Sequence, residues 1–150
     1  MKRISIGFLL TFILLILFSA CQENKWMDWK IMNDQWYAKH QTDSGFVTTS
    51  TGLCYKAIYQ GNLRRPNPQD IIYVKYKGSL IDGSVFEEAT TTLSLNQTIP
   101  GWQEGIRKMN TGGTFRFYIP SKLGYNTSTS NNAIPPNSVL IFDIELLNSY

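Results

Sequence analysis

The sequence predicts an α+β fold: several antiparallel strands joined by turns, with one short helix covering one side of the sheet. Three observations predict this class. Apolar and polar residues alternate along several short segments, as in strands that bury one face. Asp82-Gly83 is a strong hairpin signal. Residues 100–109 begin with a proline and are followed closely by Gly112-Gly113, as expected of a short helix.

The predicted strands follow a polar link at residues 42–45. The first has Leu53, Tyr55 and Ala57 on one face, and a turn rich in Gly, Asn and Pro follows it. Residues 71–76 form a β-branched and aromatic run. Two later segments, residues 115–119 and 139–147, alternate apolar with polar side chains and complete the sheet.

Residues 26–40 predict an amphipathic helix, since they contain neither Gly nor Pro. On a helical wheel Trp29, Met32 and Trp36 form one apolar stripe, which Asn33 and His40 interrupt. We expect these two polar side chains to be solvated or hydrogen-bonded. The stripe has three candidate partners: the following domain, a second copy of the chain in a homodimer, or a lipid surface. The first two are favoured, because the opposite face of the helix is not strongly basic.

The first twenty residues predict a secretion signal. Lys2 and Arg3 precede an apolar run at residues 6–18, and Ser19-Ala20 supplies the small residues that a signal peptidase needs. The run is too short to span a bilayer comfortably, which takes roughly 20 apolar residues. Two alternatives stay open: an uncleaved membrane anchor, and ordinary cleavage after Ala20 that leaves a soluble protein.

Cys21 stands directly after the two small residues. This arrangement resembles the lipobox of bacterial lipoproteins, in which the cysteine is lipidated and becomes the first residue of the mature chain. Phe18 departs from it, because an aliphatic residue is usual there. The resemblance implies a lipid anchor on Cys21 in the cell envelope. Gln22 favours the outer membrane, on its periplasmic side or at the surface.

Without its leader the chain keeps 130 of its 150 residues, enough for one compact domain. We expect a signal peptide at 1–20, a lipidated N-terminus with helix and linker at 21–50, and one folded domain at 51–150.

The composition argues against nucleic-acid and metal binding. The net charge of +3 falls to about +1 without Lys2 and Arg3, which is too small to indicate a surface that binds nucleic acid. A single histidine, His40, excludes a two-histidine metal site. Cys54, left alone, is expected to be packed or shielded.

The residue inventory argues against nucleophilic or acid–base chemistry. No Ser-His-acid or Cys-His set can be assembled, and no Gly-rich phosphate loop appears. An aromatic-lined apolar pocket remains, which suits binding or a reaction that breaks no bond. We therefore expect no cofactor and no metal.

Four motifs, in order, point to one family. Residues 74–86 (VKYKGSLIDGSVF) resemble the V-x-Y-x-G-x-L-x-D-G-x-x-F of FKBP-type peptidyl-prolyl isomerases, and residues 99–105 (IPGWQEG) their I-P-G-W-x-E-G. Gly112-Gly113 precedes a Y-I-P at residues 118–120. Residues 134–147 resemble their I-P-P-N-x-x-L-x-F-x-V-E-L-L ending. The similarity covers residues 51–147.

The resemblance implies a strongly bent antiparallel half-barrel of five or six strands wrapped around the short helix, with the pocket between them. It implies Trp102 as the pocket floor and a hydrogen bond from Tyr125 to a substrate carbonyl. The backbone N–H of Ile99 would donate another. The remaining residues that the resemblance places at the pocket are Tyr76, Phe86, Glu87 and Phe142 in the site and Thr98 and Ile134 at its rim.

Several positions depart from the family pattern. Glu87 replaces the usual Asp, and the loop between Phe86 and Trp102 is shorter than in typical members. Thr91 or Thr92 stands where an aromatic wall residue is common, so one side of the pocket should be more open. Asn126 follows the pocket tyrosine where Gly is usual, and Asn tolerates unusual backbone angles.

Two functions follow from the resemblance. One is an isomerase that acts on proline-containing polypeptide clients at the cell envelope. The other is a catalytically weak or inactive module of the same fold, serving as a chaperone or adaptor in an envelope complex. The short loop and Glu87 motivate the second.

Overall fold

A computed structural model describes residues 26–128 and 133–150, so the predicted leader and Cys21 lie outside the described residues. Six strands form one antiparallel sheet in the order β1-β2-β5-β6-β3-β4. Their bounds are β1 Val47–Thr48, β2 Cys54–Tyr59, β3 Ile71–Ser79, β4 Val85–Ser94, β5 Thr114–Ile119 and β6 Leu140–Ser149. A short helix, α2 (Pro100–Ile106), and two 3₁₀ turns, η1 (Leu95–Gln97) and η2 (Ser121–Leu123), lie in the connections.

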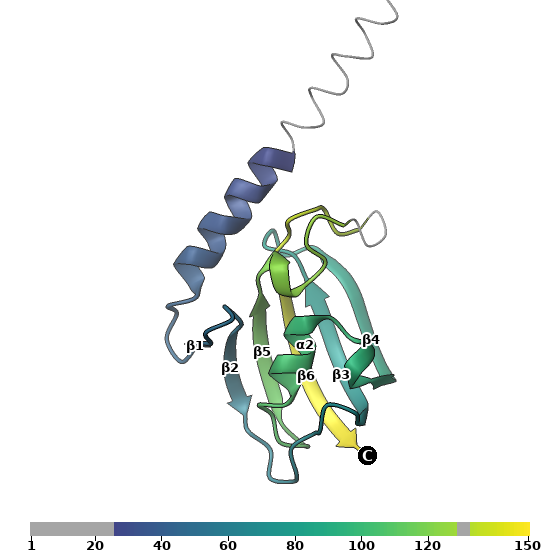
Figure 1. The fold of residues 1–150 in the computed structure, drawn as a ribbon. Helices are drawn as coiled ribbons and strands as arrows, with labels where there is room; N and C mark the ends of the chain where they lie inside the picture. Colours follow the sequence, from purple (N-terminus) through teal and green to yellow (C-terminus); the bar gives the residue numbers. More distant parts are fainter. Residues whose placement is uncertain (1–25, 129–132) are drawn as a thin grey trace, which may run out of the picture.

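The sheet curves around α2, which lies on its concave side (Figure 1). Burial along β3 alternates strictly from Ile71 to Gly78, and β6 buries every second residue from Leu140 to Leu146. The buried side chains of β3, β5 and β6 form the core beneath α2, and Phe115 and Phe117 are the largest of those that are fully buried. The predicted α+β class and bent antiparallel sheet are therefore confirmed.

Two glycines of α2 allow a close approach between the helix and β5. A Cβ on Gly101 would lie 2.5 Å from Cγ2 of Ile119, and one on Gly105 would lie 2.5 Å from Cε1 of Phe117. The helix ends at Ile106, earlier than the predicted Met109. Residues 107–109 form a turn instead, in which Met109 N–H donates to the carbonyl of Ile106, three residues back.

Residues 26–40 are helical, as predicted, and this N-terminal helix packs on the following domain. Its Trp36 ring meets Tyr118 edge-on with centroids 4.9 Å apart and stacks on His40 at 4.1 Å. The Tyr37 hydroxyl donates to the carbonyl of Gly52. Within the part of the chain that the structure describes, no helix is long and apolar enough to cross a membrane.

The predicted stripe of this helix was wrong by one residue. Met32 is 53% exposed, whereas Asn33 is 0% exposed and faces the domain. The Asn33 side chain accepts a 2.8 Å hydrogen bond from the Val139 N–H and donates one of 2.8 Å to the Trp29 carbonyl. Because both polar ends find partners, burial of the amide carries little penalty, and a polar residue occupies an apolar position of the wheel.

The prediction that Cys54 is packed is confirmed, since its thiol is free and fully buried at the start of β2. Burial raises the pKa of this thiol, which keeps it protonated and unreactive near neutral pH.

Because Tyr37 of the N-terminal helix is buried against the domain, the free energy of unfolding should fall at alkaline pH. Burial raises the pKa of Tyr37 to about 12 from 10.0 in an exposed tyrosine. Above pH 10 the unfolded chain loses this proton while the folded chain keeps it, so unfolding becomes more favourable as the pH rises toward 12. Urea titrations at several pH values should show a smaller decline for Tyr37→Phe than for wild type. The same substitution at exposed Tyr59 is the control and should leave the decline unchanged; equal slopes for all three proteins would contradict the prediction.

Candidate functional site

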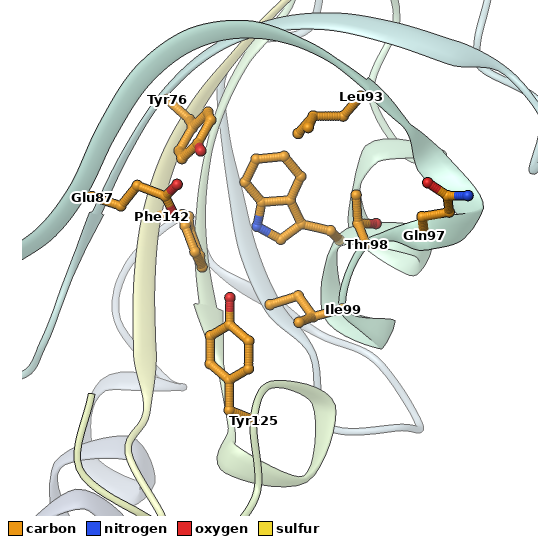
Figure 2. A pocket seen from close by; sticks show the side chains of 9 residues that line it. Tyr76, Glu87, Leu93, Gln97, Thr98, Ile99, Tyr125 and Phe142 are labelled. Carbon is orange, nitrogen blue, oxygen red and sulfur yellow. The ribbon is translucent and has the colours of Figure 1, made fainter. Parts of the chain in front are cut away.

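A cavity of about 190 Å³ lies between α2 and the concave face of the sheet. Figure 2 shows the side chains that surround it. They come from β3, β4, β6, η1 with the two residues that lead into α2, the first turn of α2 and the connection after β5. The lining residues are Tyr76, Glu87, Leu93, Gln97, Thr98, Ile99, Trp102, Tyr125 and Phe142. Seven of the nine residues that the resemblance implied are among them.

Aromatic rings set the shape of the cavity. Trp102, on α2, is 5% exposed, and its indole meets the rings of Tyr76 and Phe142 edge-on, with centroids 4.9 Å and 5.2 Å away. Edge-to-face contacts of this kind are favourable between aromatic rings and hold them in fixed orientations. The indole N–H finds no nitrogen or oxygen acceptor among residues 26–128 and 133–150. The three rings therefore form a rigid apolar enclosure.

Phe86, expected in the pocket wall, does not line the cavity. Its ring packs edge-on against Phe142 at 5.5 Å. Gly78 of β3 makes room for both rings, because a Cβ there would lie 2.5 Å from Phe86 and 2.8 Å from Phe142. Phe86 is thus a support behind the wall, and Phe142 is the residue that meets the cavity.

The polar side of the cavity is the pair Tyr76 and Glu87. The Tyr76 hydroxyl lies beside the Glu87 carboxylate (Figure 2). Burial, and then the hydrogen bond to Glu87, raise the pKa of Tyr76 above its usual value. The extra methylene of Glu87 relative to aspartate therefore still permits a contact with the tyrosine.

Replacing Glu87 by leucine should lower the free energy of unfolding by about 1–3 kcal/mol, because the hydroxyl of Tyr76 would lose its acceptor while staying buried. Glu88→Leu is the matched control. Glu88 is the next residue of β4, is exposed and pairs in register with Lys77. Its replacement should change stability by less than about 0.5 kcal/mol in urea unfolding. Equal losses for the two variants would exclude a specific role for the Tyr76 contact.

The mouth of the cavity is built by the segment that leads into α2. Thr98 lines it as expected, and its hydroxyl donates to the Leu95 carbonyl at 2.6 Å. Gln103 braces the same turn by donating to the Thr98 carbonyl at 2.6 Å. Ile99 precedes α2, and its backbone N–H donates to no residue within the described ranges.

Two lining residues, Leu93 and Gln97, were missed. Leu93 follows the threonines that stand in place of an aromatic wall, and its side chain closes part of the side expected to be open. Its position in the alternation of β4 could have indicated this, because Leu93 is six residues from Glu87 and so shares its face of the strand. No sequence signal marks Gln97.

The connection between β5 and β6 supplies Tyr125, whose hydroxyl points into the cavity (Figure 2). The next residue, Asn126, replaces the usual glycine. Its φ of +55° lies in the left-handed region, which asparagine tolerates better than most residues. Ile134, expected at the rim, does not line the cavity. It is 5% exposed and belongs to the core cluster, because its apolar side chain turns inward ahead of Pro135.

The arrangement suits binding of a small apolar ring with polar contacts at its edge. Glu87 is the one charged side chain among the described residues that line the cavity. No group of three or more His, Cys, Asp or Glu side chains that could hold a metal occurs in the described ranges.

Comparisons with known proteins agree on one family. The profile of the FKBP-type peptidyl-prolyl cis-trans isomerases matches residues 63–147. The chain is 43% identical over 108 residues to a probable FKBP-type peptidyl-prolyl cis-trans isomerase, FkpA, of Neisseria meningitidis, covering 69% of this chain and 40% of that protein. It is 34% identical over 123 residues to the outer membrane protein MIP of Legionella longbeachae, covering 79% and 53%.

The fold agrees with this relationship. The crystal structure of FkpA from Escherichia coli is similar with a TM-score of 0.85 and 32% sequence identity, covering 99% of this chain and 73% of that one. The chain spans about 40% to half the length of the curated relatives that it matches. The matched profile, the identity to these relatives and the shared fold show that the chain belongs to the FKBP-type peptidyl-prolyl cis-trans isomerase family.

Proposed function

We propose that this protein is a peptidyl-prolyl cis-trans isomerase that assists the folding of exported proteins at the cell envelope. The observation that carries the proposal is the enclosure of Trp102 by the edges of Tyr76 and Phe142, with the Tyr125 hydroxyl directed into the same cavity. A proline ring would rest on Trp102. The residue before it would place its carbonyl within reach of Tyr125.

The chemistry fits a pocket without acid–base machinery. Rotation about an X–Pro amide is opposed by a barrier of ~18–20 kcal/mol, because conjugation is lost in the twisted state. That state is less polar than the planar amide, so an apolar pocket favours it over the well-solvated ground state. The Tyr125 hydroxyl and the Ile99 N–H would hold the two carbonyls that flank the rotating bond.

A protease-coupled assay on X–Pro tetrapeptides tests this function. The wild-type chain should accelerate cis-to-trans conversion above the uncatalysed rate, and Tyr125→Phe should reduce kcat/KM by about 2- to 10-fold, the equivalent of one neutral hydrogen bond. If the folded wild-type protein does not accelerate the conversion, the proposed isomerase activity is rejected.

The second candidate is a chaperone or adaptor with the same pocket and little turnover. Glu87 in place of aspartate, and a threonine (Thr91 or Thr92) in place of an aromatic wall residue, favour it. A protein that suppresses aggregation of an unfolded client, yet leaves tetrapeptide isomerisation at the uncatalysed rate, would establish this alternative.

We also propose that a lipid on Cys21 holds the domain at the envelope, in the outer membrane. Support comes from the leader, the small residues before the cysteine and the similarity to a relative named as an outer membrane protein. Wild type should take up labelled fatty acid and sediment with membranes. A Cys21→Ala chain that stays labelled and membrane-bound would refute the anchor.

A homodimer through the N-terminal helix is a further proposal. Met27, Ile31 and Met32 are 59%, 45% and 53% exposed on that helix, although another face of it, with Trp29, Asn33 and Trp36, packs on the domain. Sedimentation equilibrium should show a dimer that Ile31→Glu dissociates, because a charge would enter an apolar interface. A monomeric wild type would exclude it.

A further inference from the structure

We propose that the N-terminal helix positions the pocket: Trp29 and Asn33 hold the β5–β6 loop (described residues 120–128 and 133–139), which carries Tyr125. The inference rests on the isomerase function proposed above. It assigns positioning roles to two residues outside the cavity, so that the helix that leads toward the membrane anchor would also support the site.

Two neighbouring contacts join the helix to the end of the loop. The indole N–H of Trp29 donates to the Ser138 hydroxyl at 2.9 Å, and that hydroxyl donates to the Pro135 carbonyl at 2.6 Å. Asn33, one turn further along the helix, accepts from the Val139 N–H at 2.8 Å. Asn33 is 0% exposed and Ser138 is 3% exposed, so these bonds are shielded from water. A shielded amide that lost its partner would stay unsatisfied, which is costly.

The same end of the loop is joined to Tyr125. Asn137, directly before Ser138, donates its N–H to the carbonyl of Asn126 at 2.8 Å, and Asn126 follows Tyr125 directly. The helix contacts and the pocket tyrosine are therefore separated by one hydrogen bond across the base of the loop.

That base holds two left-handed backbone conformations, which are uncommon for residues other than glycine. Asn126 has φ +55° and Asn137 has φ +63°, and they are the non-glycine residues with positive φ in the described ranges. Such conformations persist where surrounding contacts hold them in place. Residues 126–128 are exposed, so packing does little to hold Asn126, whereas Ile134 on the other arm of the loop packs in the core. We infer that the helix supplies the contacts that hold Asn137 and, through it, Asn126.

A small displacement of Tyr125 is enough to affect catalysis, since a hydrogen-bonding group must be held close to its productive position. A competing source of order is the η2 side of the loop, where the Asn126 N–H donates to the Ser121 carbonyl at 2.9 Å. If this bond alone fixes Tyr125, the helix is dispensable for the site. The two possibilities predict different outcomes for changes in the helix.

The test compares wild type, Asn33→Ala and Trp29→Phe. Each protein is purified from cell membranes in detergent, in the form in which cells produce it. Tyr37→Phe is the matched control, because Tyr37 also docks the helix but donates to Gly52 and not to the Ser138–Val139 end of the loop. At a temperature where circular dichroism shows every variant folded, Asn33→Ala should lower kcat/KM for a tetrapeptide by about 3- to 10-fold, chiefly through KM and by no more than Tyr125→Phe does. Tyr37→Phe should keep kcat/KM within about twofold of wild type.

A double-mutant cycle separates positioning from general destabilisation. If Asn33 acts through Tyr125, Asn33→Ala should cost little further kcat/KM when Tyr125 is already phenylalanine. An equal fold loss from Asn33→Ala in both backgrounds would show that Asn33 does not act through Tyr125 and would overturn the proposal. Unchanged kcat/KM in both Asn33→Ala and Trp29→Phe would overturn it as well.

Amide hydrogen exchange gives a readout that does not depend on turnover. The Asn137 N–H should exchange faster in Asn33→Ala and in Trp29→Phe, and at the wild-type rate in Tyr37→Phe. Unchanged exchange in the first two variants would refute the positioning role even if the wild type proved inactive. An inactive wild type with the expected exchange pattern would reject the isomerase function and leave the helix–loop coupling established. If Asn33→Ala does not fold, Trp29→Phe provides both readouts, because it removes one donor and keeps an aromatic ring.

Discussion

Replacing Trp102 by leucine should lower kcat/KM for an X–Pro peptide by about 30- to 150-fold. The substitution removes the surface on which we place the proline ring, and a buried aromatic anchor of this kind contributes about 2–3 kcal/mol. Tyr76 and Phe142 would also lose the ring that both meet edge-on. The loss should therefore exceed that of Tyr125→Phe, which removes a single hydroxyl.

The effect on stability should be smaller than usual for a buried tryptophan, because the indole N–H has no polar partner among the described residues and leucine removes this unsatisfied donor. Tetrapeptide kinetics and urea unfolding of the same sample separate the two quantities. Tyr73→Leu is the control on β3, since Tyr73 is 38% exposed and does not line the cavity. Equal kcat/KM for Trp102→Leu and Tyr73→Leu would place the active surface elsewhere.

Replacing Phe117 by alanine should lower the free energy of unfolding by about 3–5 kcal/mol, the cost of truncating a large side chain in a packed core. Phe117 is 1% exposed and stacks with Phe115, with ring centroids 5.9 Å apart. Its ring also lies directly against Gly105 of α2. Domains of this size are stabilised by only about 5–15 kcal/mol, so the variant should unfold at much lower urea concentration.

Tyr59→Ala is the comparison for this truncation, because Tyr59 lies at the end of neighbouring β2 and is 57% exposed. It should change the free energy of unfolding by less than about 0.5 kcal/mol. A loss below about 1.5 kcal/mol for Phe117→Ala would mean that α2 moves onto β5 and refills the space.

The fold class could be predicted because local chemistry agrees with it at each element. Alternation along β3 and β6, the Asp82-Gly83 turn and the proline that opens α2 each act over a few residues, so a single sequence reveals them. The boundaries were less predictable. Whether residues 107–109 continue α2 depends on the path to Gly112-Gly113, which no local pattern sets.

The candidate site divides in the same way. Residues inside short motifs, such as Trp102 in the first turn of α2 and Tyr76 on β3, lie at the cavity as expected. Phe86 and Ile134 do not, because an apolar residue near a pocket can face either the cavity or the core, and packing decides between them. Phe86 packs against Phe142 instead, because Gly78 has no side chain and leaves space for both rings.

The N-terminal helix shows the limit most clearly. Its existence follows from its composition, but the face that it buries does not, because hydrophobicity alone assigned Met32 to that face. Asn33 is buried on that face instead, because its side-chain oxygen accepts a hydrogen bond from the backbone N–H of Val139, more than a hundred residues away in the chain. By itself, then, the sequence determined the α+β class, the order of elements and the aromatic inventory of the pocket, all of which depend on local pattern and motif. Only the tertiary structure decided which aromatic rings meet the cavity and which residues join the helix to the β5–β6 loop, because those outcomes depend on steric fit and hydrogen bonds between segments far apart in the chain.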